Sequence, residues 1–383
     1  MKPKHIVGAL ALFSLTAPLC AATSPVLRQQ PGSTEAAQTP PRHIDIIEGP
    51  IGQAVDAILT TEAARGFGGT VVVVVAGEVV LQGGYGFADR DRRLPYTAHT
   101  PHEIGSISKV FTAMALFDLE ARGLVDLSKP VSAYLPTAAQ PAASLTLDQL
   151  LRHRGGMVEY CGSDNERGTK ADLLTRCMAA PLISRPGGES RYSNPGFSVL
   201  AAVVEQVSGT SLNEYLTKRM LRPLGLDRTG YIGAGADTSE IARSYLGGRP
   251  QPLSSAQTAL GERWQVYGNG GMISTAVDMF HFQLALAGTI PMKAAVRGRM
   301  VTPPSGSQPR QVERYGFGIT ADDQGKPHSV SHGGSNGSFA SSFYWRPQER
   351  AFIYMSGNSG EDDVVRVIRL VRTAVLPSVP AAP

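Results

Sequence analysis

A serine and a lysine lie three residues apart in the stretch 103–114, where a polar segment gives way to an apolar one. Positions i and i+3 of an α-helix share a face, so the Lys109 amine can reach the Ser106 hydroxyl. Serine becomes a strong nucleophile only when a neighbouring base takes its proton. An amine can be that base where burial or a nearby positive charge lowers its pKa toward neutrality. The pair therefore indicates nucleophilic catalysis, with Ser106 as the nucleophile and Lys109 as the base.

The surroundings of this pair favour a functional role over a chance match. Ser-x-x-Lys is a short pattern, which by itself is only a hypothesis. Among all lysines in the chain, however, only Lys109 has a serine three places earlier. The residues that follow it are apolar on nearly every side of the expected helix, which is typical of a buried helix. Ser106 would begin that helix, where free backbone N–H groups favour a developing oxyanion.

The tripeptide Tyr192-Ser193-Asn194 supplies a candidate proton shuttle and a polar anchor. It lies just before an apolar helical run, so its side chains can project from a loop into a cleft. Tyr192 could carry a proton to the leaving group if Lys109 lowers its pKa. Asn194 could hold a substrate carbonyl or orient Lys109. It could equally be the N-cap of the following helix, with Pro195 at the first helical position.

A third candidate segment, His332-Gly333-Gly334-Ser335, ends a predicted strand. Glycines such as Gly334 let a substrate approach the backbone closely, as an edge strand at an active site requires. The backbone N–H of Ser335 could form an oxyanion hole together with that of Ser106. Alternatively, His332 could be an ordinary histidine in a turn, with no role in catalysis or binding.

The elements that must position these segments are strands at both ends of the chain and helices between them. β-Branched and alternating runs predict strands over 70–75, 78–81, 315–320, 329–332, 338–345 and 351–356. Capping and periodicity signals predict helices over about 46–64, 106–123, 146–155, 194–209, 211–221, 275–288 and 362–375. The fold class is therefore α/β (α+β), with a mainly antiparallel sheet because the late strands follow one another through short links. We expect a sheet subdomain at 44–104 plus 260–383 and a helical subdomain at 105–259.

The first 43 residues predict export. Residues 1–22 have the pattern of a secretory signal, with two lysines followed by an apolar run that is too short to span a membrane. Residues 23–43 have the composition of a disordered linker. Cys20 raises the alternative of a lipoprotein, which Leu19 disfavours because a small residue is expected before a lipidated cysteine. The formal net charge is +4, and Lys2 and Lys4 of the expected signal contribute to it. The net positive charge of the rest of the chain is therefore too small to indicate nucleic-acid binding. We expect a periplasmic or secreted domain at 44–383.

Two cysteines, Cys161 and Cys177, remain after the signal segment. In an exported protein such a pair favours a disulfide, and two buried free thiols are the alternative. The loop between them lies between the first and second motifs, where it could rim the site and shape specificity.

The three motifs Ser106-x-x-Lys109, Tyr192-Ser193-Asn194 and His332-Gly333-Gly334, in this order along the chain, resemble those of the serine β-lactamase and penicillin-binding protein superfamily. The likeness is to the branch of class C β-lactamases, D-Ala-D-Ala carboxypeptidases, D-aminopeptidases and related esterases, and it covers roughly residues 45–375. Smaller signatures agree, namely Leu150–Gly156, Pro223–Leu226 and Gly270–Asp278. The family order also favours Tyr192-Ser193-Asn194 over a second Tyr-x-Asn pattern at Tyr267-Gly268-Asn269.

The resemblance implies roles for these residues. Ser106 would be acylated with Lys109 as the base, and Tyr192 would protonate the leaving group and help to activate the hydrolytic water. Asn194 would contact substrate and Lys109. The implied fold is a β-lactamase/transpeptidase-like sheet flanked by helices, with the site beside a helical subdomain. The substrate would be a small molecule or peptide, and no metal, cofactor or membrane span is expected.

One departure bears on the substrate. The third motif of class C β-lactamases resembles Lys-Thr-Gly, whereas this chain has His332-Gly333-Gly334. A lysine offers a permanent positive charge to a substrate carboxylate, while a histidine is mostly neutral at pH 7. The motif therefore favours a peptidase-like hydrolase first, an esterase second and a β-lactamase third. A non-catalytic binding or sensing protein is the alternative from another class, and it predicts damaged motifs, which this chain does not have.

Overall fold

The computed structural model of the protein describes residues 40–164, 166–233, 237–251 and 264–376. The expected signal segment, Cys20 and nearly all of the expected linker lie outside these residues. Within the described ranges, no helix is both long enough and apolar enough to cross a membrane.

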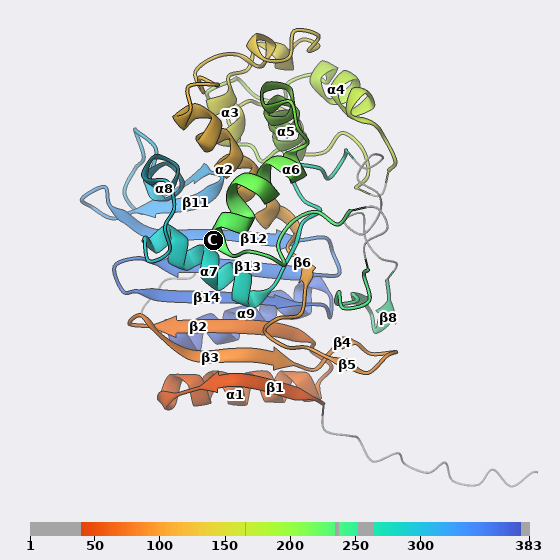
Figure 1. Ribbon diagram of the computed structural model, residues 1–383, viewed down its shortest axis with the longest axis vertical. Coiled ribbons are helices and arrows are strands. Elements are labelled where there is room, and N and C mark those ends of the chain that lie inside the picture. The colour runs from red at the N-terminus through yellow and green to blue at the C-terminus, as the bar shows by residue number, and fades with distance from the viewer. Residues whose placement is uncertain (1–39, 165, 234–236, 252–263, 377–383) are drawn as a thin grey trace, which may run out of the picture. The chain divides into compact units, whose positions relative to one another are not determined.

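One antiparallel sheet of eight strands connects the two ends of the chain (Figure 1), in the order β1-β3-β2-β14-β13-β12-β11-β10. Its strands are β1 Arg42–Ile47, β2 Gly69–Val75, β3 Glu78–Tyr85, β10 Val312–Tyr315, β11 Phe317–Ala321, β12 Pro327–Ser335, β13 Ala340–Arg346 and β14 Ala351–Gly357. The central pairing joins early strand β2 to late strand β14, with Val72 opposite Tyr354. The expectation of an antiparallel sheet built from both chain ends is confirmed.

Helices cover both faces of this sheet, which explains the unbroken run of valines in β2. Val71 and Val73 pack with α1 (Gly49–Ala64) and α9 (Glu361–Val375). Val72 and Val74 point the other way, into the larger core that contains α2 (Ser108–Ala121) and α7 (Ala276–Ala287). Successive strand residues face opposite sides, so a strand buried on both faces has no polar alternation.

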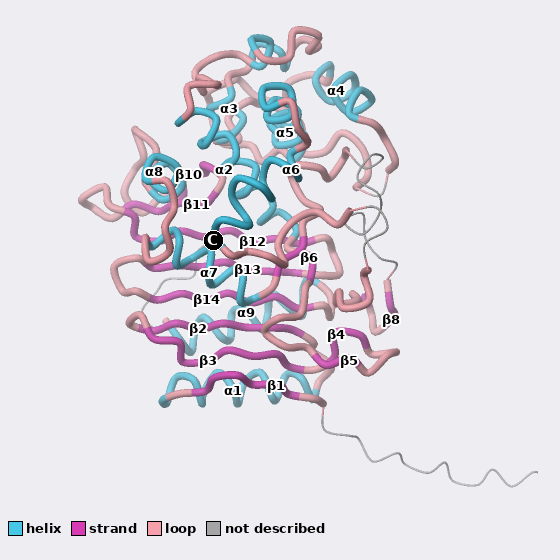
Figure 2. Tube along the Cα trace, in the orientation of Figure 1, coloured by secondary structure: helices cyan, strands magenta, loops and turns pink. Residues whose placement is uncertain are grey.

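The remaining helices gather beside the β11–β10 end of the sheet, as Figures 1 and 2 show. They are α3 Leu147–Leu151, α4 Lys170–Ala179, α5 Asn194–Ser208, α6 Leu212–Leu216 and α8 Ala294–Val301. Three short strand pairs complete the fold, namely β4 Phe87–Asp89 with β5 Leu94–Pro95, β6 His102–Glu103 with β9 Ile273–Ser274, and β7 Tyr245–Leu246 with β8 Arg249–Pro250. A capping box opens α3 where the sequence predicts a helix from residue 146, with the Thr146 hydroxyl accepting from the Gln149 backbone N–H at 3.1 Å.

The structure corrects several boundaries. Residues 42–47, expected as the end of a linker and the start of a helix, form edge strand β1, and the helix begins at Gly49. The strand predicted over 315–320 is divided by a turn at Gly316, whose φ of +79° suits glycine. Helices α4 and α8 were not predicted. The sequence of α8 carries little apolar periodicity, whereas α4 has a signal that was missed, a capping box between Thr169 and Asp172 followed by buried Leu173 and Cys177.

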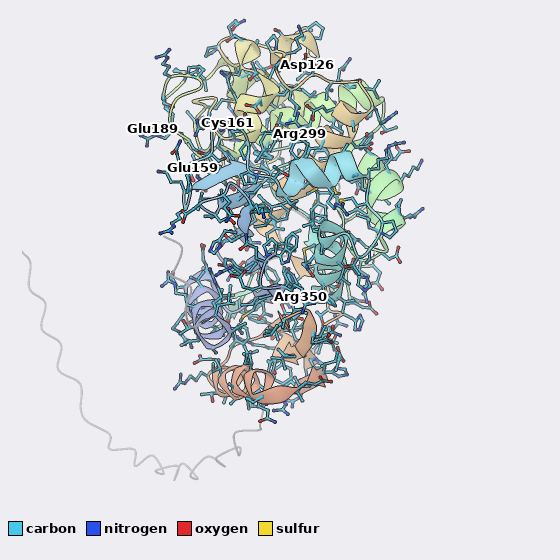
Figure 3. The ribbon with its side chains drawn as sticks, turned by 90° about the vertical axis from the view of Figure 1, so that its left-hand side faces the viewer. Asp126, Glu159, Cys161, Glu189, Arg299 and Arg350 are labelled. Atoms are coloured by element: carbon cyan, nitrogen blue, oxygen red, sulfur yellow. A yellow bond between two sulfur atoms is a disulfide. The ribbon has the colours of Figure 1, made fainter. Side chains whose placement is uncertain are left out.

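Cys161 and Cys177 form the expected disulfide, with their Cα atoms 5.5 Å apart. The bond ties the loop after Tyr160 to α4 in the helical part of the molecule (Figure 3).

Candidate active site

Ser106 and Lys109 lie in the turn that leads into the most deeply buried helix. Gly105–Ile107 form one turn of 3-10 helix, η1, directly before α2. The Lys109 Nζ atom is 3.0 Å from the Ser106 Oγ atom. It also donates to the backbone carbonyl of Asn269 at 2.6 Å. The Lys109 side chain is fully buried, so these two oxygens fix its amine at hydrogen-bond distance from the hydroxyl.

Burial sets the charge state of Lys109. It lowers the lysine pKa to about 7, although the negative charges of Asp164 and Glu159 act in the opposite direction. Above that pH the amine is neutral and its lone pair can accept the Ser106 proton. The aromatic rings of Tyr192 and Phe197 lie 4.9 and 5.9 Å from Nζ and keep water from it.

Tyr192 reaches the same serine. Its phenol is hydrogen-bonded to Ser106, which lowers its pKa, but the larger effect of burial raises the pKa of Tyr192 to about 12. The expectation that Lys109 lowers the pKa of Tyr192 is therefore wrong in direction. A phenol with this pKa keeps its proton at neutral pH, so it is suited to donate a proton rather than to act as an anionic base.

His153 holds Tyr192 in place, a contact that the sequence did not predict. The two rings stack with centroids 4.3 Å apart. The backbone N–H groups on either side of Tyr192 both donate to this histidine, that of Arg191 to its carbonyl at 2.7 Å and that of Ser193 to its Nδ1 at 3.0 Å. Accepting at Nδ1 requires the neutral ring, and burial keeps the pKa of His153 well below its usual value.

Asn194 takes a different position from the one expected. The N-cap of α5 is Ser193, whose hydroxyl accepts from the Gly196 N–H at 3.2 Å, and Asn194 is the first helical residue. The Asn194 side chain is hydrogen-bonded to Tyr160. The second contact of Lys109 is the Asn269 carbonyl, from the Tyr-x-Asn pattern that the sequence analysis set aside.

The backbone of β12 lies directly against the turn that carries Ser106. A Cβ atom on Gly334 would lie 2.0 Å from the Ile104 carbonyl oxygen, and one on Gly105 would lie 2.5 Å from the Ser335 nitrogen. Both glycines are therefore required by close approach of two backbones. This contact brings the Ser335 nitrogen to the η1 turn, where the two N–H groups of Ser335 and Ser106 can serve one oxyanion.

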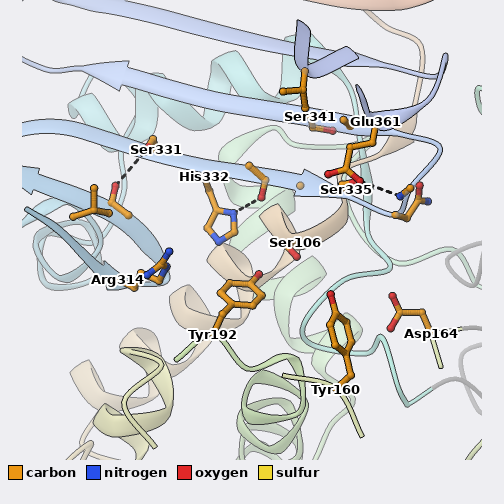
Figure 4. A pocket seen from close by; sticks show the side chains of 18 of the residues that line it. Ser106, Tyr160, Asp164, Tyr192, Arg314, Ser331, His332, Ser335, Ser341 and Glu361 are labelled. Atoms are coloured by element: carbon orange, nitrogen blue, oxygen red, sulfur yellow. Dashed lines mark hydrogen bonds between the residues drawn. The ribbon is translucent and has the colours of Figure 1, made fainter. Parts of the chain in front are cut away.

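β12 leaves an open edge beside the serine. Its pairing with β11 ends at Ser331, while its pairing with β13 continues to Ser335. Residues 332–335 can therefore hydrogen-bond an extended substrate. His332 lies on this edge beside Tyr192 (Figure 4). Burial and the nearby Lys109 lower its pKa to about 4, so it is neutral at pH 7, as the sequence analysis expected.

These residues open into one cleft of about 1050 Å³, large enough for a short peptide. Its lining includes the predicted Ser106, Tyr192, His332, Gly334 and Ser335. Lys109 and Asn194 lie behind it. Further lining residues, which no sequence motif indicated, are Tyr160, Asp164, Arg310, Arg314 and Glu361. The described residues contain no group of three or more histidine, cysteine and acidic side chains arranged to hold a metal ion.

Two curated relatives align with much of the chain. PbpX of Bacillus subtilis (strain 168) is 28% identical over 254 residues, 66% of this chain and 62% of the relative. Protein flp of Staphylococcus aureus (strain N315) is 24% identical over 337 residues, 85% of this chain and 66% of the relative. The chain thus spans slightly less than two thirds of the length of these relatives.

Solved structures share the fold. EstCE1, described as a hydrolase with promiscuous acyltransferase activity, superposes with a TM-score of 0.72 at 22% identity, covering 85% of this chain and 98% of that one. A β-lactamase/D-alanine carboxypeptidase from Pseudomonas syringae gives a TM-score of 0.71 at 17% identity, covering 86% and 100%. The model of the Beta-lactamase family matches residues 54–376, which is most of the chain. The chain therefore belongs to the beta-lactamase family.

Proposed function

We propose that this protein is an exported serine hydrolase that cleaves amide or ester bonds through an acyl-enzyme on Ser106. The observation that carries this proposal is the 3.0 Å contact between Ser106 Oγ and a buried Lys109 amine whose pKa lies near 7. A lysine in this state is a general base at physiological pH, which an ordinary surface lysine is not.

Each step of the reaction has a candidate residue. Lys109 takes the proton of Ser106 as Oγ attacks the substrate carbonyl carbon, and the backbone N–H groups of Ser106 and Ser335 hold the oxyanion. Tyr192 gives its proton to the departing nitrogen or oxygen as that bond breaks. In the second half of the reaction, the Tyr192 phenolate takes a proton from the attacking water, and protonated Lys109 returns its proton to Ser106 Oγ as the ester bond breaks. Water thereby hydrolyses the ester on Ser106, and Tyr160, held by Asn194 from behind, lines the cleft beside the acyl group.

The neutral His332 bears on the choice among substrates. A β-lactamase of the Lys-Thr-Gly type has a fixed positive charge at this position, and His332 supplies none at pH 7. We therefore rank a DD-peptidase-like activity first, a carboxylesterase second, and a β-lactamase or a β-lactam-binding sensor last. The resemblance of the fold to EstCE1 supports keeping the esterase in this ranking.

A panel of three substrates tests the proposal: a D-Ala-D-Ala peptide, p-nitrophenyl butyrate and a chromogenic cephalosporin, each with wild type and Ser106→Ala. We expect turnover of the peptide or the ester that falls by at least about 10³-fold in the variant. Equal rates in both proteins would contradict a Ser106 acyl-enzyme. Cephalosporin turnover well above the other two would reverse the ranking.

A further inference from the structure

The charged side chains of the cleft are separated into two groups on opposite sides of Ser106. Figure 4 shows Arg314 beside His332 and Tyr192 on one side. Asp164 and Glu361 lie on the other side, with Tyr160 next to Asp164. All of these residues line the same cleft.

Arg314 is the uncompensated cation of the first side. Its neighbour Glu313 is paired with Arg154 at 3.1 Å and Arg152 at 3.4 Å. Arg310 is paired with Asp323 at 2.8 Å. No ion pair joins Arg314 to any residue in the described ranges, and its side chain is exposed to the cleft. Its positive charge acts to lower the pKa values of both Tyr192 and His332, although burial has the larger effect on each of them.

The second side carries two acidic side chains, Glu361 and Asp164. Burial raises the pKa of Asp164, while the charge of Lys109 acts to lower it. Glu361 begins α9, where the positive end of the helix dipole favours an ionised acid. Within the described part of the chain, neither Glu361 nor Asp164 forms an ion pair. Asp363 in the same turn is 3.9 Å from Arg366. Glu103, behind Asn336, adds little charge at pH 7 because burial raises its pKa to about 8.

The catalytic groups assign one substrate half to each side, and this step rests on the proposed function. Tyr192 donates to the leaving group, so the leaving half extends toward His332 and Arg314. The acyl carbonyl lies at the Ser335 N–H, so the acyl half extends past Ser335 toward Glu361 and Asp164. An anionic group is therefore favoured on the leaving half and a cationic group on the acyl half.

We propose that this cleft selects short zwitterionic substrates, in which the acyl half bears an ammonium group and the leaving half bears a carboxylate. Small peptides and amino-acyl esters of carboxylate-bearing alcohols have this chemistry. Arg314 would bind the carboxylate, and Glu361 with Asp164 would bind the ammonium. These three are specificity residues, since none of them contacts the Ser106 hydroxyl.

Four matched esters, each prepared in both enantiomers to give eight compounds, test this assignment. The acyl group is either alanyl, with a free ammonium, or N-acetylalanyl, each in both enantiomers. The leaving group is either 4-hydroxybenzoate or the neutral 4-hydroxybenzamide. Rates are corrected for spontaneous hydrolysis and expressed as kcat/KM. We expect each charge to raise kcat/KM about tenfold in the favoured enantiomer, the effect of one ion pair in a partly hydrated cleft.

Charge-removing variants assign each preference to its residues. Arg314→Gln should reduce the preference for the benzoate ester to about twofold or less and leave the ammonium preference intact. Glu361→Gln combined with Asp164→Asn should do the reverse. Asp362→Asn and Arg369→Gln are matched controls on α9 that lie outside the cleft lining, and both ratios should be unchanged in them.

The outcomes separate this proposal from the proposed function. Equal wild-type rates for all four esters, or a preference for the neutral ones, would overturn the charge assignment while leaving a Ser106-dependent hydrolase. Failure to hydrolyse any ester by a protein that a fluorophosphonate still labels on Ser106 would also overturn it. Undiminished hydrolysis by Ser106→Ala would instead reject the proposed function itself.

Discussion

The protonation states of Lys109 and Tyr192 determine what the site can do. Burial lowers the pKa of the lysine to about 7 and raises that of the tyrosine to about 12. Near pH 8 the site therefore holds a neutral amine and a protonated phenol, one ready to accept a proton and the other to donate one. The two groups share Ser106 as a hydrogen-bond partner, so the base and the acid both act at the same reacting oxygen.

The pH dependence of activity follows from the lowered lysine pKa. Below about pH 7 the amine is protonated and cannot accept the serine proton, so kcat/KM should rise with pH and level off above about 8. Lys109→Arg keeps a permanent charge and should be inactive throughout this range. The profile is measured from pH 5.5 to 9 on an ester substrate. A wild-type profile without an inflection between pH 6 and 8 would contradict the role of Lys109.

His153 should act on the reaction through Tyr192. His153→Phe keeps an aromatic ring next to Tyr192 but removes the acceptor of the Ser193 N–H. We expect kcat to fall about 10- to 100-fold for esters with poor leaving groups and much less for good ones, since only poor ones need the proton. The readout is the slope of log kcat against leaving-group pKa. An equal loss for every leaving group would indicate a merely structural role.

At the scale of elements, the site depends on the contact between β12 and the η1 turn. Gly334 and Gly333 are adjacent but differ in their surroundings. A Cβ atom on Gly334 would clash with the Ile104 carbonyl at 2.0 Å, whereas one on Gly333 meets nothing nearer than Ser341 O at 3.8 Å. Gly334→Ala should therefore lower the acylation rate of Ser106 at least about 100-fold, the typical cost of losing an oxyanion-hole donor.

Gly333→Ala is the matched control for this prediction. It should change acylation by about threefold at most, since its Cβ has room. Acylation is followed by fluorophosphonate labelling, with circular dichroism to check folding. Equal activity of the two variants would show that the β12 contact does not position the oxyanion donors.

The parts of the site predicted from the sequence are those encoded locally. The Ser106–Lys109 distance follows from helical geometry, and the cap at Thr275 needs only the following turn, where its hydroxyl accepts from Asp278 at 3.0 Å. Other parts of the site could not be predicted, because tertiary folding brings them to the serine from distant segments. They are the Asn269 carbonyl, the His153 ring that stacks on Tyr192, and Arg314. Strand β1 was not predicted although Ile44 and Ile46 alternate with exposed residues, because the run is short and directly follows the expected linker.

At the scale of the whole molecule, the disulfide fixes the loop that forms one wall of the cleft. Tyr160 and Asp164 line the cleft on either side of Cys161. Replacing both cysteines by serine should lower the free energy of unfolding by roughly 3 kcal/mol in the chain-entropy account of a loop of this size. It should also raise KM more than it lowers kcat, since the catalytic groups lie elsewhere. Denaturant unfolding and steady-state kinetics check both, and unchanged values of both would contradict this role.

The central claim is the covalent bond to Ser106, and the mass of the enzyme during turnover tests it most directly. Wild-type protein is mixed with an ester substrate, quenched in acid within the steady state, digested and analysed by mass spectrometry. We predict one acyl group on the peptide that contains Ser106, absent from Ser106→Ala and lost from wild type once substrate is exhausted. Turnover by folded enzyme with no acyl group on that peptide, or with the acyl group on another residue, would contradict the account.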